Sequence, residues 1–205
     1  MKSTRFNPPI EWNPTIMGHQ KTRMNRYFFG LVQLIEGVGN FLSVPYRENT
    51  KMIEIGSYSG ESTLLFASSL AFDHIYCIDP FEGDEEMNSI SGKDWNQVKK
   101  DFDFNTRYYK GNGKELGETK ISLIQDYSYN VVDQFENKSI DFIYIDGSHK
   151  IEDIKRDIDL YLPKLKNNSF IAGHDYNWPG VKDLLDSYSD DYIHFGDESW
   201  AIKIL

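Results

Sequence analysis

Acidic and imidazole side chains recur at the ends of short apolar runs in this sequence. In chain order they are Glu54, Asp79, Asp126, Asp146, His149, His174 and Asp175. Carboxylates accept hydrogen bonds from hydroxyl groups or hold hard cations, and histidine exchanges protons near neutral pH. Any one of them alone is more simply a solvated loop residue or a helix cap. Five such run ends in succession indicate one shared ligand site.

The apolar runs are spaced as strands that alternate with helices. Expected strands cover residues 51–55, 74–79, 121–124, 140–145 and 169–172, and expected helices cover 94–109, 151–165 and 181–188. Asn167-Asn168 is typical of a turn, and residues 192–195 with 200–204 read as a closing β-hairpin. The pattern predicts an α/β fold: a doubly wound, mostly parallel seven-stranded sheet with a C-terminal antiparallel hairpin strand. In such a sheet the carboxyl ends of the strands face one ligand crevice.

A glycine turn follows the first of these strands. Gly56 and Gly60 precede an apolar helical pattern at residues 64–70, and strand, glycine turn and helix together are typical of a nucleotide-type cofactor site. The G-x-G-x-x-G pattern of pyrophosphate sites is absent. Glu54 beside this loop suits a cationic ligand, such as a sulfonium with an amino-acid tail. Asp79 falls about twenty residues later, where an acid commonly binds a ribose.

Composition restricts the class of partner. The chain has 205 residues and a formal net charge of −10, which disfavours nucleic acid and anionic membranes as partners. No apolar stretch is long enough to span a membrane, and the start lacks a signal-peptide core, so we expect a cytoplasmic protein. The single cysteine, Cys77, lies in an apolar run and is expected to be a buried structural thiol.

The chain is expected to form one unit with an N-terminal extension. Residues 1–50 are predicted to form an extended arm, up to about residue 14, and then one or two helices over 16–41 that end at Gly37 and Gly39. Two roles stay open for this part: a lid over the site, or a dimer contact, which would make the protein a homo-oligomer. Residues 51–205 form the predicted catalytic domain. The basic group of Lys21, Arg23 and Arg26 is read as a helix face or as a site for an anionic substrate.

Four segments of this domain resemble a known family. MIEIGSYSGESTLLFA, IYCIDPFEGD, DFIYIDGSHKIEDIKRDIDLYLPKLK and FIAGHDYN are similar to class I S-adenosylmethionine-dependent methyltransferases. The branch that they resemble most includes macrolide-sugar O-methyltransferases and cephalosporin-hydroxylase-like proteins. The resemblance covers residues 51–205, and the I-D-G-x-H and A-G-H-D-Y segments are its specific part.

The resemblance implies a role for each residue at a matching position. S-adenosylmethionine would be held by Glu54, Gly56, Ser57, Tyr58, Gly60 and Ser62 at its methionine portion, by Asp79 at the ribose, by Asp126 and Tyr127 at the adenine, and by Asp146. Asp146 and Asp175 would bind a divalent cation such as Mg²⁺. Asp146, His149 and His174 are the implied catalytic residues. Tyr176 departs from the macrolide-sugar enzymes, which carry an acid at this position.

The implied reaction is O-methylation of a hydroxyl on a small molecule or sugar. The N-P-P-[YF] signature of amino-group methylation of nucleic acids is missing after residues 140–145. His149 is read equally as a base and as a structural partner of Asp175, whereas the structural role is favoured for His174. Trp178 is a candidate for the acceptor pocket, and Trp200 is expected in the core. The alternatives are an NAD-type oxidoreductase on a similar sheet and a non-catalytic cofactor-binding protein.

Overall fold

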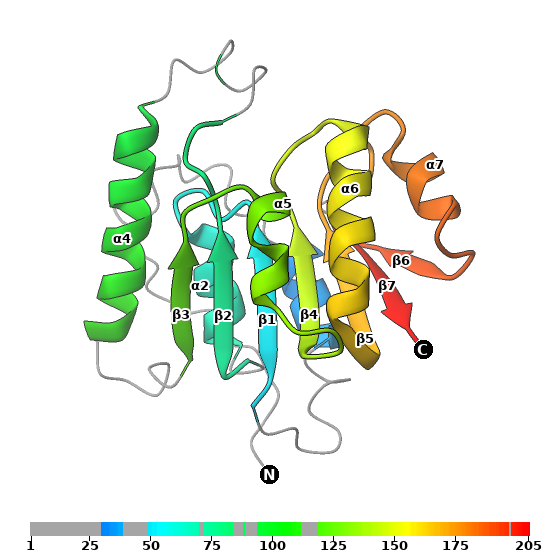
Figure 1. Ribbon diagram of the computed structural model, residues 1–205, viewed down its shortest axis with the longest axis horizontal. Coiled ribbons are helices and arrows are strands. Elements are labelled where there is room, and N and C mark those ends of the chain that lie inside the picture. The colour runs from blue at the N-terminus through cyan, green and yellow to red at the C-terminus, as the bar shows by residue number, and fades with distance from the viewer. Residues whose placement is uncertain are drawn as a thin grey trace.

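The computed structural model describes residues 30–38, 49–69, 72–83, 88, 94–111, 119–196 and 198–205 (Figure 1). The predicted arm at residues 1–14, the basic group of Lys21, Arg23 and Arg26, and most of the polar stretch at 84–93 lie outside the described residues. Among the described residues, no helix is both long enough and apolar enough to cross a membrane.

Seven strands form one sheet in the order β3-β2-β1-β4-β5-β7-β6. The strands are β1 (Lys51–Ile55), β2 (His74–Ile78), β3 (Lys120–Ile124), β4 (Ile140–Ile145), β5 (Leu165–Gly173), β6 (Tyr192–His194) and β7 (Trp200–Ile204). Strands β1 to β5 pair in parallel, and β7 runs antiparallel to both β5 and β6. The prediction of a mostly parallel seven-stranded sheet with an antiparallel hairpin strand at its C-terminal end is confirmed.

Helices cover both faces of this sheet. They are α2 (Glu61–Ser68), α4 (Trp95–Gly111), α5 (Ser128–Val131), α6 (Ile151–Tyr161), α7 (Val181–Asp186), the 3-10 turns η1 (Val132–Gln134) and η2 (Leu162–Lys164), and a helix at residues 30–38. Figure 1 shows α5 and α6 in front of the sheet, with α2 and the helix at 30–38 behind it.

Strand β1 shows how the sequence divides the core between the two faces. Successive strand side chains point to opposite faces, so Met52 packs in a cluster with Phe66 of α2, whereas Ile53 packs in a second cluster with Ile158 of α6. All four side chains are fully buried. Complete burial of an apolar side chain of this size stabilises the fold by about 1.5–3 kcal/mol. The central strand is therefore fixed from both faces.

The connection from α6 to β5 differs from the prediction. A helix was expected up to residue 165 with a turn at Asn167-Asn168, but α6 ends at Tyr161 and β5 already begins at Leu165. Pro163 explains the early end, because proline removes a helical hydrogen bond and clashes with the preceding turn. Asn168 lies inside β5 with a φ of 57°, beside a register shift between Ile140 and Phe142 of the neighbouring strand. The predicted turn is thus an irregularity within a strand.

The helix at residues 30–38 confirms the apolar pattern predicted for this part of the chain. Leu31, Leu34, Ile35 and Val38 are buried and belong to the same cluster as Met52. Gly37 lies within this helix, and Gly39, the other glycine predicted to end it, lies outside the described residues. The helix thus closes the rear face of the sheet.

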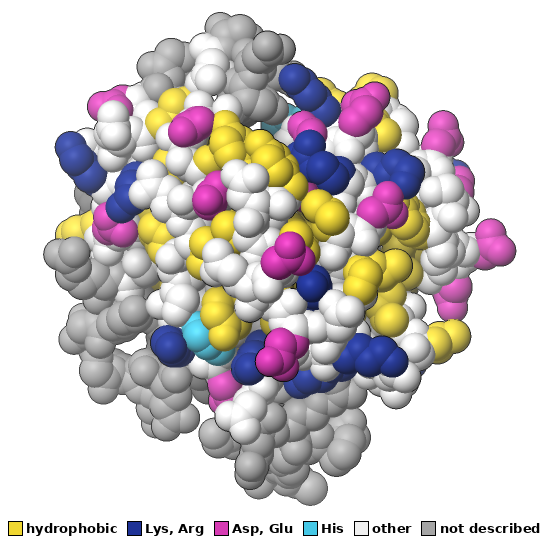
Figure 2. Space-filling model, in the orientation of Figure 1, with side chains coloured by type: hydrophobic (Ala, Val, Ile, Leu, Met, Phe, Trp, Pro, Cys, Tyr) yellow, Lys and Arg dark blue, Asp and Glu magenta, His cyan; other side chains and the backbone are white. Residues whose placement is uncertain are grey.

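The outer face of α6 carries charges of both signs. Ion pairs join Lys155 to Asp159 at 2.5 Å and Arg156 to Asp153 at 2.9 Å. Figure 2 shows acidic and basic side chains interspersed over this side of the molecule, without a continuous basic surface among the residues it colours.

Candidate active site

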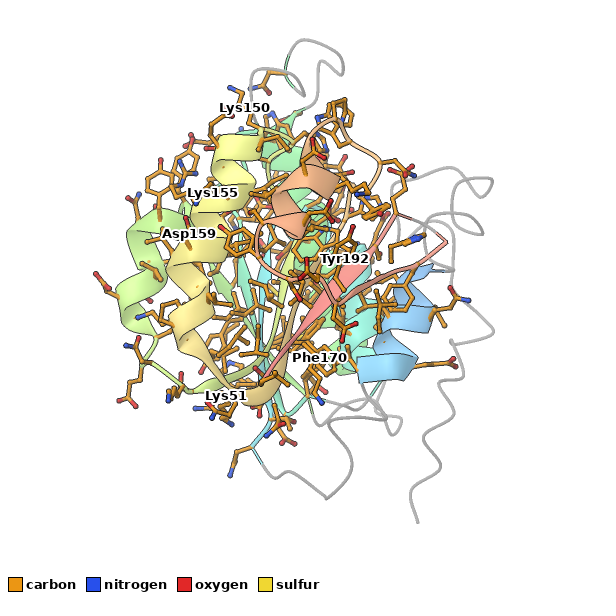
Figure 3. All side chains as sticks on the ribbon, turned by 90° about the vertical axis from the view of Figure 1, so that its right-hand side faces the viewer. Lys51, Lys150, Lys155, Asp159, Phe170 and Tyr192 are labelled. Carbon is orange, nitrogen blue, oxygen red and sulfur yellow. The ribbon has the colours of Figure 1, made fainter. Side chains whose placement is uncertain are left out.

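The residues singled out for chemistry follow the carboxyl ends of β1 to β5, at one end of the sheet. Figure 3 shows this polarity: Lys51, the first residue of β1, lies at the lower end, and Lys150, which precedes α6, lies at the upper end. Because parallel strands share their direction, the loops after all five strands emerge at the upper end. The topology therefore brings the predicted residues to one edge.

Backbone hydrogen bonds extend the sheet one residue into these loops. The amide of Gly56 donates to the last carbonyl of β2 at 2.9 Å. The amide of Asp146 donates to the last carbonyl of β1 at 2.8 Å, and the amide of His174 donates to the last carbonyl of β4 at 3.1 Å. The first residue of each of these three loops is therefore hydrogen-bonded like a strand residue. The backbone from which its side chain extends is fixed.

The loop after β1 has the backbone that only glycine adopts at low cost. Gly56 and Gly60 have φ values of 85° and 84°, and Tyr58 between them has a φ of 45°. A β carbon at Gly56 would lie 2.2 Å from the carbonyl oxygen of Asp146, well inside any real contact. Gly60 is the N-cap of α2, so the loop delivers the chain directly to a helix start, where unpaired amides favour an electron-rich group. The lack of a side chain at Gly56 thus lets the loop pack against the Asp146 backbone, and at Gly60 it leaves room for the Phe102 ring, 3.1 Å from the position of a β carbon.

Glu54 is fully buried beneath this loop. Ser62 Oγ donates to Glu54 Oε1 at 2.5 Å, and Thr63 Oγ1 donates to Glu54 Oε2. Burial raises the pKa of the Glu54 carboxyl, and the hydrogen bonds from these hydroxyls partly offset the increase. Glu54 and Ser62 thus tie β1 to α2 and hold the loop from below. Their predicted contact with the methionine portion of a cofactor stays a prediction.

Cys77 lies beside Glu54, with its sulfur 3.6 Å from Glu54 Oε2. The thiol is fully buried, and burial, followed by the nearby Glu54 charge, raises its pKa well above the ordinary value. Cys77 is therefore held as an unreactive thiol, as the sequence predicted.

Asp79 lies at the tip of β2 and faces the same loop. Its Oδ2 accepts a hydrogen bond from the Tyr58 amide at 2.8 Å, and its Oδ1 accepts one from the Phe81 amide at 2.7 Å. Burial raises the pKa of the Asp79 carboxyl, and these backbone bonds act in the opposite direction. Each carboxylate oxygen has a second lone pair, so Asp79 can also accept two hydrogen bonds from hydroxyl groups. A carboxylate that accepts such hydrogen bonds beside the glycine loop suits the two hydroxyl groups of a ribose.

Asp126 and Tyr127 follow β3 on the far side of Asp79. Asp126 Oδ1 accepts hydrogen bonds from the Tyr127 amide at 2.7 Å and from Asn130 Nδ2 at 2.8 Å. The Tyr127 hydroxyl donates to Glu82 Oε2 at 2.7 Å, which joins the loop after β3 to the loop after β2. The hydrogen bond to Glu82 is the main reason that the pKa of Tyr127 is raised. The exposed Tyr127 ring is stacked on Tyr129, with 5.3 Å between ring centroids.

Asp146, His174 and Asp175 form the tightest group of polar side chains at this edge. His174 Nδ1 lies 3.0 Å from Asp175 Oδ1 and 3.9 Å from Asp146 Oδ1. One ligand atom from each of the three lies within 4.8 Å of the other two. All three side chains are partly buried, and Asp175 holds a φ of 62°. The two acids assigned to a cation by resemblance are therefore brought together, and a histidine nitrogen is added to them.

His149 approaches the same group from the start of α6. Its Nε2 lies 3.5 Å from Asp175 Oδ2, the carboxylate oxygen that faces away from His174. The His149 ring is stacked on Trp178, with 5.0 Å between centroids and 28° between planes. The Trp178 amide in turn donates to the Asp175 carbonyl at 2.8 Å. The loop after β5 thus carries both Asp175 and an aromatic ring that is 37% exposed beside it.

Trp200 supports this arrangement from the core, where the sequence analysis placed it. The ring is buried, and its Nε1 donates to the His174 carbonyl at 2.8 Å. A β carbon at Gly173 would lie 2.5 Å from the Trp200 ring and 2.6 Å from the Ile145 carbonyl. The residue before His174 must therefore be glycine, since Trp200 occupies the space of any side chain.

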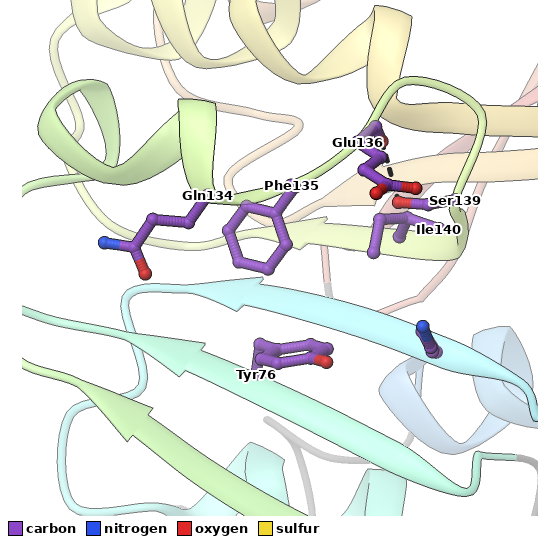
Figure 4. A pocket seen from close by; sticks show the side chains of 7 residues that line it. Tyr76, Gln134, Phe135, Glu136, Ser139 and Ile140 are labelled. Atoms are coloured by element: carbon purple, nitrogen blue, oxygen red, sulfur yellow. Dashed lines mark hydrogen bonds between the residues drawn. The ribbon is translucent and has the colours of Figure 1, made fainter.

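A pocket elsewhere on the molecule does not belong to this site. A cavity of about 250 Å³ lies near the amino ends of β1 and β4, at the opposite end of these strands from Asp146. Figure 4 shows the side chains that line it. It is lined by Lys51, Tyr76, Gln134, Phe135, Glu136, Ser139 and Ile140.

The sequence predicted that these residues meet at one edge of the sheet, but it did not predict two of the contacts there. Glu82 was one acid among several in a polar stretch, and no spacing connected it to Tyr127 across 45 residues. His174 was favoured as structural, and its distances of 3.0 Å to Asp175 Oδ1 and 3.9 Å to Asp146 Oδ1 were not among the expectations. The available signal was the pair His174-Asp175 at the end of a strand, where two chemically different side chains follow each other.

The chain was compared with known proteins. Residues 53–176 match a family model described as a methyltransferase domain. The protein y4gI of Sinorhizobium fredii is 23% identical over 61% of this chain but only 13% of its own length. The protein R132 of Acanthamoeba polyphaga mimivirus is 23% identical over 77% of this chain and 64% of its own length. The chain therefore spans less than two thirds of both relatives.

Solved structures share the fold at low identity. A putative caffeoyl-CoA O-methyltransferase from Staphylococcus aureus has a TM-score of 0.56 and 16% identity, over 91% of this chain and 92% of its own. An rRNA methylase from Streptococcus thermophilus has a TM-score of 0.54 and 14% identity, over 83% of this chain and 96% of its own. Identities this low establish a common fold and leave the acceptors of these proteins as properties of those proteins.

Proposed function

The chain belongs to the methyltransferase domain family, and from that premise we propose that it is an S-adenosylmethionine-dependent enzyme that methylates a hydroxyl oxygen of a small molecule or sugar. A divalent cation held by Asp146 and Asp175 is part of this proposal. Family membership favours a methyltransferase over the NAD-type and non-catalytic alternatives.

The cofactor half of the proposed site consists of the glycine loop, Asp79 and Tyr127. The residues fit S-adenosylmethionine because the lack of a side chain at Gly56 lets the glycine loop lie against the Asp146 backbone, and Asp79 offers two carboxylate oxygens to ribose hydroxyls beside that loop. The Tyr127 ring offers an exposed flat surface for the adenine. When bound, the cofactor supplies a sulfonium methyl group for an in-line displacement.

The acceptor half consists of the group formed by Asp146, His174 and Asp175. Its position carries the proposal: the Asp146 backbone touches the cofactor loop at Gly56, so an acceptor held by these acids lies next to the cofactor. Alignment of two reactants accounts for much of the rate of such a transfer. A bound cation would lower the pKa of the acceptor hydroxyl. The donor set of two carboxylates and one imidazole fits a divalent ion.

The proton of the acceptor hydroxyl needs a base, and we assign this role to His149. The new bond forms between the acceptor oxygen and the methyl carbon, the carbon–sulfur bond breaks with its electrons moving to sulfur, and the hydroxyl proton passes to the imidazole. His149 lies beside Asp175 and is held by Trp178, and a quarter of its side chain is exposed (25%). Trp178 would form one wall of the acceptor pocket.

The segment after β4 and the net charge of the chain both support oxygen as the acceptor atom. I-D-G-S-H follows β4 where enzymes that methylate nucleic-acid amino groups carry N-P-P-[YF], and the net charge of −10 opposes a phosphate-rich substrate. The test is to measure formation of S-adenosylhomocysteine with acceptors that carry vicinal hydroxyls, namely catechols and sugars, and with the matched amines. Turnover of hydroxyl acceptors that is lost with EDTA and restored by a divalent cation supports the proposal. Turnover of the amines alone, unaffected by EDTA, would contradict it.

The acids can be tested separately from the fold. Asp175→Asn is expected to abolish turnover and to leave binding of S-adenosylmethionine unchanged. Glu152→Gln is the matched control, because Glu152 is an exposed acid in the first turn of α6 with no place in the site. Loss of turnover in both variants would mean that the loss reflects charge or folding and not the position of Asp175.

A further inference from the structure

The group at the carboxyl ends of β4 and β5 is not a purely acidic cluster. It joins two carboxylates, from Asp146 and Asp175, with one imidazole nitrogen, His174 Nδ1. That nitrogen lies 3.0 Å from Asp175 Oδ1 and 3.9 Å from Asp146 Oδ1, so it faces both acids. The three ligand atoms all lie within 4.8 Å of one another, a spacing at which they could hold one metal ion.

The nitrogen is held in this position by the core. The His174 amide donates to the last carbonyl of β4 at 3.1 Å, and its carbonyl accepts from Trp200 Nε1 at 2.8 Å. Gly173 before it has no room for a side chain because of the Trp200 ring. The backbone of His174 is therefore fixed on both sides, and its ring is placed by the 3.0 Å hydrogen bond between Nδ1 and Asp175 Oδ1.

We infer that this site takes a first-row transition cation of the Mn²⁺, Fe²⁺, Co²⁺ or Zn²⁺ class in preference to Mg²⁺, with His174 Nδ1 as the nitrogen ligand. The inference rests on the proposed cation-assisted function and specifies its ion. Mg²⁺ and Ca²⁺ are bound by oxygen atoms, whereas imidazole nitrogen favours transition cations. A site with oxygen ligands alone would suit Mg²⁺, but the His174 nitrogen makes this a mixed nitrogen and oxygen site.

His149 is not a ligand in this account. Its Nε2 lies 3.5 Å from Asp175 Oδ2, whereas His174 lies on the side of Oδ1. Asp175 is thus between two histidines, one of which shares the ion with it and the other of which contacts its outer oxygen. The two histidines therefore give opposite expectations in a spectroscopic test, and His149 serves as the matched control.

The test uses the full chain without an affinity tag, stripped of metal and loaded with Mn²⁺. Pulsed electron paramagnetic resonance detects a nitrogen bound to Mn²⁺ as modulation of the spin echo. We expect this modulation in the parent and in His149→Asn, a shift in its frequency after labelling with ¹⁵N-histidine, and its loss in His174→Asp. His174→Asp keeps three carboxylates, so it should still bind Mn²⁺ and should lower the preference for Mn²⁺ over Mg²⁺ by about tenfold.

The outcomes separate this inference from the proposed function. Mn²⁺ that binds to the parent without nitrogen modulation, or an equal affinity of the parent for Mg²⁺ and Mn²⁺, overturns the inference and leaves cation-assisted methylation standing. Binding of neither ion, while S-adenosylmethionine still binds, overturns both. If His174→Asp fails to fold, His174→Asn replaces it, and the parent labelled with ¹⁵N-histidine decides whether nitrogen is bound.

Discussion

A β carbon at Gly56 would lie 2.2 Å from the carbonyl oxygen of Asp146, so the cofactor loop after β1 and the acid after β4 are in direct backbone contact. The Asp146 amide also donates to the last carbonyl of β1 at 2.8 Å. The two halves of the proposed site are therefore coupled through the backbone and not through flexible side chains. A change of loop geometry at Gly56 should displace Asp146 as well.

Gly56→Ala is expected to abolish cofactor binding. The substitution places a methyl group against the Asp146 carbonyl and requires alanine at a φ of 85°, a region that costs a residue with a β carbon roughly 1–2 kcal/mol before the clash is counted. Calorimetric titration with S-adenosylmethionine measures the loss. Gly37→Ala is the control, because no described atom lies within 4 Å of a β carbon there and the position is helical. It should be neutral or stabilising by up to about 1 kcal/mol. Normal cofactor binding by Gly56→Ala would contradict the proposed contact.

Tyr127 allows the ring and the hydroxyl to be tested separately. Tyr127→Phe removes the hydrogen bond to Glu82 and keeps the flat surface, so S-adenosylmethionine affinity should fall by no more than a few fold, about 1 kcal/mol. Tyr127→Ala removes the ring and should cost more, since stacking of a base on an aromatic side chain contributes about 1–3 kcal/mol. Tyr129→Ala, which removes the outer ring of the stacked pair, is the control and should have the smaller effect. Equal affinities for Tyr127→Ala and the parent would remove Tyr127 from the adenine site.

Asp157 should make the stability of the protein depend on pH. It lies buried in α6, where it accepts a hydrogen bond from Ser128 Oγ at 2.5 Å, and the Tyr161 hydroxyl donates to the Ser128 carbonyl at 2.8 Å. Burial raises the pKa of Asp157 to about 6. Because the folded carboxyl binds its proton more tightly than the unfolded one, its contribution to stability is greatest at low pH. That contribution is lost as the pH rises from about 4 to above 6.

Asp157→Asn removes this titration while keeping an acceptor for Ser128. The variant should be more stable than the parent at about pH 8, by up to roughly 3 kcal/mol, because each pKa unit corresponds to 1.36 kcal/mol. The difference should shrink toward zero as the pH falls to about 4. Urea unfolding of both proteins across this range measures it. A difference that stays constant with pH would show that Asp157 has an ordinary pKa.

The general architecture was readable from local patterns. Short apolar runs such as residues 140–145 are fully buried strands, and the hairpin after residue 191 reversed the last strand as predicted. Gly56 and Gly60 predicted the loop, because the sequence places them between a strand and a helix. These features depend on few residues close together in the chain, so one sequence is enough to find them.

What the sequence missed depends on contacts between distant segments. The Asn167-Asn168 pair is typical of a turn, yet it lies within β5, because Leu165 before it and Phe170 after it both pair with β4. Glu54 was expected to line the loop, but which face its side chain takes follows from the pleat and from Ser62 and Thr63, eight and nine residues later. Likewise, the side-chain distances around His174 required the strands to be in place.

The proposed site has a cofactor half at Asp79 and an acceptor half at Asp175, and one calorimetric experiment tests this division. S-adenosylmethionine and S-adenosylhomocysteine are titrated into the parent, Asp79→Asn and Asp175→Asn, and the thermal midpoint of each protein without ligand checks its folding. Asp79→Asn should weaken both ligands about 10- to 100-fold, as expected when hydrogen bonds to a charged group are lost. Asp175→Asn should bind both like the parent. Equal binding by Asp79→Asn and the parent, or equal weakening by the two variants, would contradict the account.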